Sequence, residues 1–138
     1  MSRVLFDTNI VSELVRPKPE PRIQAFVRDQ ADPLISVLTI HEIAYGAERA
    51  PDAARRAKLV AWVASIQGQF AGRIVDIDAG VAEQAGRLRA AAVAQGAPAD
   101  PIDALIAACA LTRGAAIATR NVHDFAAFGV RIIDPWTA

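Results

Sequence analysis

Short apolar runs alternate along the chain with longer segments in which apolar residues recur at helical spacing. Five runs are strand-like, and most are apolar at consecutive positions: 4–6, 34–38, 73–77, 116–119 and 130–133. Strands that are apolar on both faces are typical of a parallel sheet covered by helices on either side.

The segments between these runs predict helices. The clearest span 21–30, 53–69, 79–95 and 101–113. Gly96 and Gly114 follow the last two and suit left-handed helix ends, while Pro17, Pro19 and Pro21 form a connector after an earlier helix. The alternation predicts an α/β fold, a three-layer α/β/α sandwich with a central parallel five-stranded sheet, as a single domain over residues 1–138.

Composition narrows the class without changing this picture. With 138 residues, 53% of them hydrophobic, the chain suits one soluble globular domain and is too apolar for intrinsic disorder. Its longest apolar run, 104–111, falls short of the roughly 20 residues of a membrane span, and no secretory signal is evident, so we expect a cytoplasmic protein without a membrane segment. The 15 basic and 15 acidic residues cancel, which argues against binding nucleic acid by bulk charge.

Four acidic residues lie at predicted strand ends or helix starts. Asp7 directly follows the first strand, and Glu42 follows the second by one turn. Asp103 lies in the first turn of a later helix, and Asp124 follows the fourth strand. Ligands of open parallel sheets bind beyond the carboxyl ends of the strands, so these acids are candidate site residues.

Taken singly, each of the later acids is explained by helix capping. The capping patterns are Thr39 with Glu42, Asp100 with Pro101 and Asp103, and Asn121 with Asp124. Taken together, carboxylates converging on one sheet edge repel one another unless a cation offsets their charge. Oxygen ligands without paired His or Cys favour Mg²⁺ or Mn²⁺ over Zn²⁺, and such an ion activates water for phosphodiester hydrolysis.

At this point the sequence resembles PIN-domain ribonucleases, and among them the VapC-like and FitB-like toxins of type II toxin–antitoxin pairs. The resemblance covers nearly the whole chain. It rests on DTNIVSEL at 7–14, TIHEIAYG at 39–46, DALIAACAL at 103–111, ATRNVHDF at 118–125 and the DPW at 134–136.

The resemblance implies metal-dependent cleavage of RNA, with Asp7, Glu42 and Asp103 matching the family's metal-binding acids. Many relatives carry an acid directly after the Thr-Arg pair, where this chain has Asn121, so either Asn121 or Asp124 serves the fourth catalytic position. It further implies a VapB-like antitoxin as partner, in a complex whose assembly the sequence leaves open.

Five further residues are expected to support the site. Thr8 and Asn9 either cap the first helix or orient Asp7, and Ser12 lies one turn further on. Thr119 ends its strand, where it can hydrogen-bond to Asp7 or to metal-bound water. Arg120 pairs either with RNA phosphate or with a surface acid.

Two other functions remain open at this stage. A PIN fold that has lost catalysis would be a binding module, and the Asn121 departure makes this conceivable. A phosphoacceptor signalling domain also carries acids at a sheet edge, but it needs a lysine after its last strand, and the only lysines are Lys18 and Lys58. Broad apolar helix stripes further predict a homodimer.

Charge segregation changes the first interpretation of the zero net charge. When the four candidate acids are left out of the count, 11 acidic residues remain against 15 basic ones, which gives a net charge of +4 for the rest of the chain. Thirteen of the basic residues are arginine, which makes forked contacts with phosphate. A metal-centred site that engages RNA locally is therefore compatible with the composition.

Overall fold

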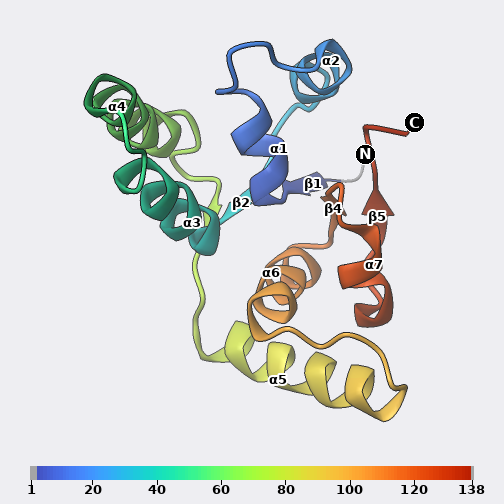
Figure 1. Ribbon diagram of the computed structural model, residues 1–138. Helices are drawn as coiled ribbons and strands as arrows, with labels where there is room; N and C mark the ends of the chain where they lie inside the picture. The colour runs from blue at the N-terminus through green and yellow to red at the C-terminus, as the bar shows by residue number, and fades with distance from the viewer. Residues whose placement is uncertain (1–2, 138) are drawn as a thin grey trace.

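A computed structural model describes residues 3–137 of the chain (Figure 1). Its elements, in chain order, are β1 (Arg3–Phe6), α1 (Thr8–Glu13), α2 (Pro21–Arg28), β2 (Ile35–Ser36), α3 (Val37–Glu48), α4 (Ala53–Gln69), β3 (Ile74–Val75), α5 (Ala79–Ala94), α6 (Pro101–Thr112), β4 (Ala115–Ala118), α7 (Val122–Phe125), the 3₁₀ turn η1 (Ala126–Phe128) and β5 (Ile132–Ile133). The four helices predicted from apolar spacing are α2, α4, α5 and α6. Gly96 and Gly114 have the expected left-handed backbone, with φ of 70° and 63°. Residues 3–137 include no helix with the length and apolar character needed to cross a bilayer.

The strands are parallel, but their regular pairing is divided. One sheet has the order β1-β4-β5, and β2 pairs with β3 in the other. A bridge between Leu5 and Leu34 links β1 to β2, and the Phe6 N–H donates to the Leu34 carbonyl at 2.8 Å. The predicted parallel arrangement is confirmed, whereas one continuous five-stranded sheet is not.

The break has a local cause at the start of α3. The Ser36 hydroxyl accepts a hydrogen bond from the Leu38 N–H at 3.1 Å, so the helix begins at Val37. The apolar run predicted as a strand over 34–38 therefore contributes only two residues to β2. A short apolar run fits a buried strand and a buried helix start equally well, which is why periodicity misplaced this boundary.

Helices cover both faces of the strands (Figure 1). Val4 and Phe6 of β1 pack among residues of α1 to α4, whereas Leu5 packs among residues of α5, α6 and α7. This alternation gives the three layers expected from the sequence. In space, β1 lies between β2 on one side and β4 on the other. The chain therefore continues in opposite directions from the two sides of β1, and the strand order reverses between β1 and β4. Asp7 and Thr119, which follow these two strands, stand at the position where open α/β sheets bind ligands.

Candidate active site

An open pocket of about 330 Å³ lies at this reversal point. Residues from the end of β1, from α1, α3 and α6, and from the start of α7 line it: Asp7, Thr8, Asn9, Ser12, Glu42, Asp103, Ile106 and Asn121. The structure therefore brings together three of the four acids that the sequence singled out, three of the five residues expected to support them, and Asn121.

Asp7 is only 6% exposed and is held by three hydrogen bonds. The Thr8 N–H donates to Oδ1 at 2.8 Å, while the Thr119 hydroxyl and the Asn9 amide donate to Oδ2 at 2.7 Å and 3.3 Å. The predicted bond from Thr119 is confirmed. Asp7 itself caps α1, so Asn9 orients the carboxylate rather than capping the helix. Burial raises the pKa of Asp7, the Thr119 and Thr8 bonds lower it, and the negative charge of Asp124 raises it.

Glu42 lies inside α3, one turn after the buried Thr39. The Thr8 hydroxyl donates to Glu42 Oε1 at 2.9 Å and lies 3.0 Å from the Thr39 hydroxyl. Because the single Thr8 hydroxyl proton is used by Glu42, Thr39 donates to Thr8. Burial raises the pKa of Glu42, and the bond from Thr8 opposes that shift.

The capping box proposed for Thr39 and Glu42 is therefore wrong, because Ser36 caps α3. Thr39 instead belongs to the hydrogen-bonded chain that holds Glu42. Its position three residues before Glu42 was the available signal, since residues at this spacing share one helix face.

Asp103 opens α6, where the predicted cap is confirmed. Asp100 Oδ2 accepts from the Asp103 N–H at 3.0 Å, and Pro101 is the first residue of the helix. Burial and then the negative charge of Asp100 raise the pKa of Asp103 to about 7, with further contributions from the other acids. Asp100 was considered only as a cap, yet its charge also acts on the pocket.

At the fourth position, Asn121 lines the pocket and Asp124 does not. The Asn121 side chain makes no capping bond to α7, so the capping role proposed for it is wrong. Its N–H donates to the Thr119 hydroxyl at 3.0 Å. Asp124 acts at longer range, because its negative charge raises the pKa of both Asp7 and Asp103.

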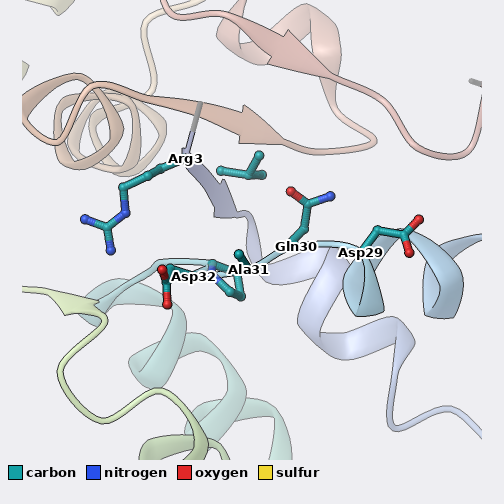
Figure 2. Close-up of a pocket in the computed structure, with 7 residues that line it drawn as sticks. Arg3, Asp29, Gln30, Ala31 and Asp32 are labelled. Carbon is teal, nitrogen blue, oxygen red and sulfur yellow. The ribbon is translucent and has the colours of Figure 1, made fainter. Parts of the chain in front are cut away.

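Another pocket lies at the opposite end of β1. It measures about 130 Å³ and is lined by Arg3, Val4, Pro33 and residues 29–32. In Figure 2, Arg3 and Asp32 lie to the left of the view and Asp29 to the right. None of the candidate site residues belongs to this pocket.

The donor set at the reversal point suits a hard cation. Within residues 3–137 the ion pairs join Arg16 to Glu13 and Arg87 to Glu83, so no protein cation pairs with the pocket acids. Nor do any three Asp, Glu, His or Cys side chains in this part of the chain already enclose a metal position. Asp7 and Glu42 are held by threonine hydroxyls instead.

Comparison with known proteins agrees with this geometry. The tRNA(fMet)-specific endonuclease VapC of Shigella flexneri is 34% identical over 99% of this chain and 100% of its own length. The crystal structure of FitAcB from Neisseria gonorrhoeae superposes with a TM-score of 0.93 at 31% identity, covering 98% of this chain and 99% of that one. A toxin–antitoxin complex from Klebsiella pneumoniae gives a TM-score of 0.72 at 27% identity, covering 96% and 97%. Residues 4–130 match the PIN domain, and the chain belongs to the PIN-domain family.

Proposed function

We propose that this protein is an endoribonuclease dependent on Mg²⁺, for which Mn²⁺ can substitute, and that it acts as the toxin of a toxin–antitoxin pair. The observation that carries the proposal is the group of three carboxylates around one pocket, Asp7, Glu42 and Asp103. Their pKa values are all raised, and no lysine or arginine of residues 3–137 pairs with them. The relative named as a tRNA-specific endonuclease supports RNA as the substrate.

In this proposal the three acids hold the ion and the neighbouring polar groups fix their orientation. When bound, a divalent cation activates water and offsets charge on the phosphodiester. Thr119 and Asn9 fix the Asp7 carboxylate, and Thr8 fixes Glu42. Asn121 offers a neutral amide oxygen at the pocket wall. Asp124 does not line the pocket, but its negative charge raises the pKa of Asp103.

The proposal predicts metal-dependent cleavage of single-stranded RNA and tRNA by the purified protein. Products should end in a 3′-hydroxyl and a 5′-phosphate, and EDTA or Asp7→Asn should abolish cleavage. Asp32→Asn is the matched control, because Asp32 is an exposed acid at the opposite end of β1. Cleavage that survives both EDTA and Asp7→Asn would refute the proposal.

The principal rival is a PIN fold that binds without cutting, and the neutral Asn121 at the pocket favours it. Isothermal titration with Mn²⁺ separates the two: the nuclease should bind the ion in a manner that Asp7→Asn abolishes. Absence of both Mn²⁺ binding and RNA cleavage would support the binding module.

We further propose a small VapB-like antitoxin and a homodimer as the assembly. The Klebsiella pneumoniae neighbour is a toxin–antitoxin complex, which supports the first partner. Exposed apolar side chains such as Val60 on α4 and Val93 on α5 support self-association. Sedimentation of the purified chain, alone and with the product of a neighbouring gene, distinguishes monomer, dimer and mixed complex.

A further inference from the structure

A basic pocket of about 230 Å³ lies beside the candidate active site. Its lining comes from the end of α1, the connector before α2, and the segments after β4 and β5: Glu13, Arg16, Lys18, Glu20, Arg120 and Trp136. We call it the basic pocket. Asp7, Glu42 and Asp103 do not line it.

Arg120 connects the basic pocket to the candidate active site. It directly follows Thr119, whose hydroxyl donates to Asp7 at 2.7 Å. The Arg120 N–H donates to Asn9 Oδ1 at 3.4 Å, and the amide of the same Asn9 donates to Asp7. The backbone that carries the arginine is thus held by the residues that orient the central carboxylate.

The Arg120 guanidinium lies over the ring of Trp136, with 5.2 Å between Cζ and the ring centroid. The backbone of Trp136 is also held. Its backbone N–H donates to the Asp134 carboxylate at 2.9 Å, and its carbonyl accepts from the Arg22 side chain. Stacking occupies the face of a guanidinium and leaves its N–H edges available for forked contacts with phosphate.

The opposite wall of the basic pocket is fixed by Glu13, which is only 5% exposed. Arg16 donates to one of its carboxylate oxygens at 3.1 Å, and the Glu20 N–H donates to the other at 3.0 Å. Both ends of the connector are therefore tied to α1. Lys18 lies between two prolines in this connector, where restricted backbone freedom lowers the entropy lost on binding.

The free charge of the basic pocket is positive. Glu13 is paired with Arg16, and the Glu20 carboxylate accepts only from the backbone N–H of Arg22, so Lys18 and Arg120 against Glu20 leave a balance of +1. Lys18 and Arg120 form no ion pair with an Asp or Glu among residues 3–137. Two exposed cations thus face the space beside an aromatic ring.

We infer that the basic pocket binds a backbone phosphate of the substrate RNA next to the phosphate that is cut, through Arg120 and Lys18. The inference rests on the proposed function. Cations that follow the backbone, placed beside an aromatic ring, are the arrangement that binds single-stranded nucleic acid. An RNA strand held at the acids lies close to Arg120, because Arg120 directly follows the Thr119 that contacts Asp7.

The test measures RNA binding by fluorescence anisotropy with a labelled single-stranded RNA of mixed sequence, in an Asp7→Asn background that cannot cut it. Arg120→Gln and Lys18→Gln should each weaken binding about fourfold near physiological salt, and each should lower the salt exponent of binding by about 0.7. Arg28→Gln is the control, because Arg28 is an exposed arginine next to Asp29, at the opposite end of the sheet. In the cutting protein, Arg120→Gln should raise KM more than it lowers kcat, with Mn²⁺ affinity unchanged.

Equal weakening by Arg28→Gln would overturn the inference, since the effect would then be one of bulk charge. Unchanged RNA binding in Arg120→Gln and Lys18→Gln would also overturn the inference. This holds even if these variants weaken the binding of a protein partner instead. If the unmodified protein neither cuts nor binds RNA, the proposed function itself fails. If the unmodified protein cuts RNA and the variants bind RNA as tightly as it does, only the role of the basic pocket is refuted and the proposed function stands.

Discussion

Thr119 makes as many side-chain hydrogen bonds in the pocket region as Asp7, the acid that it supports. Its hydroxyl donates to Asp7 and accepts from the Asn9 amide at 3.2 Å and from the Asn121 N–H. A hydroxyl has one proton and two lone pairs, so all of its hydrogen-bonding capacity is used. The orientation of Asp7 and the position of the segment after β4 therefore depend on the same atom.

Thr119→Val keeps the shape of this side chain and removes the hydroxyl. We expect a loss of about 10- to 100-fold in Mn²⁺ affinity or in RNA cleavage, because a partner that orients a metal ligand contributes on that scale. Titration calorimetry and initial cleavage rates provide the measurements. Thr112→Val is the control, since Thr112 donates only to the Cys109 carbonyl at the end of α6. Equal losses in the two variants would contradict a specific role for Thr119.

Asp103 makes the stability of the metal-free protein depend on pH. Its pKa is about 7 in the folded chain against an ordinary value of 3.8, so the folded state binds more protons between these values. The contribution of Asp103 to stability is then fully present below the lower value and is lost as pH rises through about 7. The raised pKa values of Asp7 and Glu42 act in the same direction.

We therefore expect the Tm of the protein in EDTA to fall as pH rises from about 5 to about 7, and Asp103→Asn to make this dependence shallower. Circular dichroism melts over this range measure it, with Asp32→Asn as the control. A Tm that rises with pH, or a slope that Asp103→Asn leaves unchanged, would show that Asp103 does not take up a proton in this window.

The sequence was a good guide to the acids and a poor one to their partners. Asp7 and Glu42 could be singled out because each closely follows a strand end, and strand ends of a parallel sheet share an edge. Asp103 could be singled out by its place in the first turn of a helix. The Thr8 bond to Glu42 joins residues 34 positions apart. No local pattern encodes a contact of that kind, because it depends on how α1 and α3 pack.

Element boundaries follow from single hydrogen bonds more than from periodicity. The helix α4 runs over Ala53–Gln69 as its apolar spacing predicts, because Asp52 caps it through the Arg55 N–H at 2.7 Å. At β2, the residues of the apolar run are similar in the strand and in the first turn of α3, so periodicity does not mark the boundary. The N-cap Ser36 sets the first residue of α3. Since Glu42 lies in the second turn of α3, this cap also sets the height of the carboxylate in the pocket.

Ser36→Ala should lower the free energy of unfolding by about 1 kcal/mol, and by up to about 2 because the site is buried. Urea denaturation followed by circular dichroism measures this change. Ser65→Ala is the control, because Ser65 is exposed on α4 and accepts only from the Gln69 side chain at 2.9 Å. A cost no larger than that of Ser65→Ala would mean that the cap contributes little to α3.

At the scale of the whole molecule, the zero net charge conceals two opposite regions. The acids gather in the candidate active site, whereas Lys18 and Arg120 stand in the adjoining basic pocket. Without a bound cation, an RNA strand that crosses both regions is attracted at one and repelled at the other. Under the proposed function, an electrically neutral chain would therefore need divalent ions for substrate binding as well as for catalysis.

The same reasoning predicts that one inactivating substitution improves RNA binding. In EDTA at about pH 8, where Asp103 is ionised, Asp103→Asn should bind single-stranded RNA roughly threefold more tightly than the unmodified protein, because a negative charge next to the substrate is lost. With Mg²⁺ the order should reverse, since the variant then lacks a ligand for the ion. Asp32→Asn changes the net charge equally at the far end of the sheet and should have a much smaller effect in either buffer. Fluorescence anisotropy with an RNA analogue that the protein cannot cut measures the six affinities in the two buffers. Tighter binding by Asp32→Asn to the same degree would assign the effect to net charge instead of to the position of the acid.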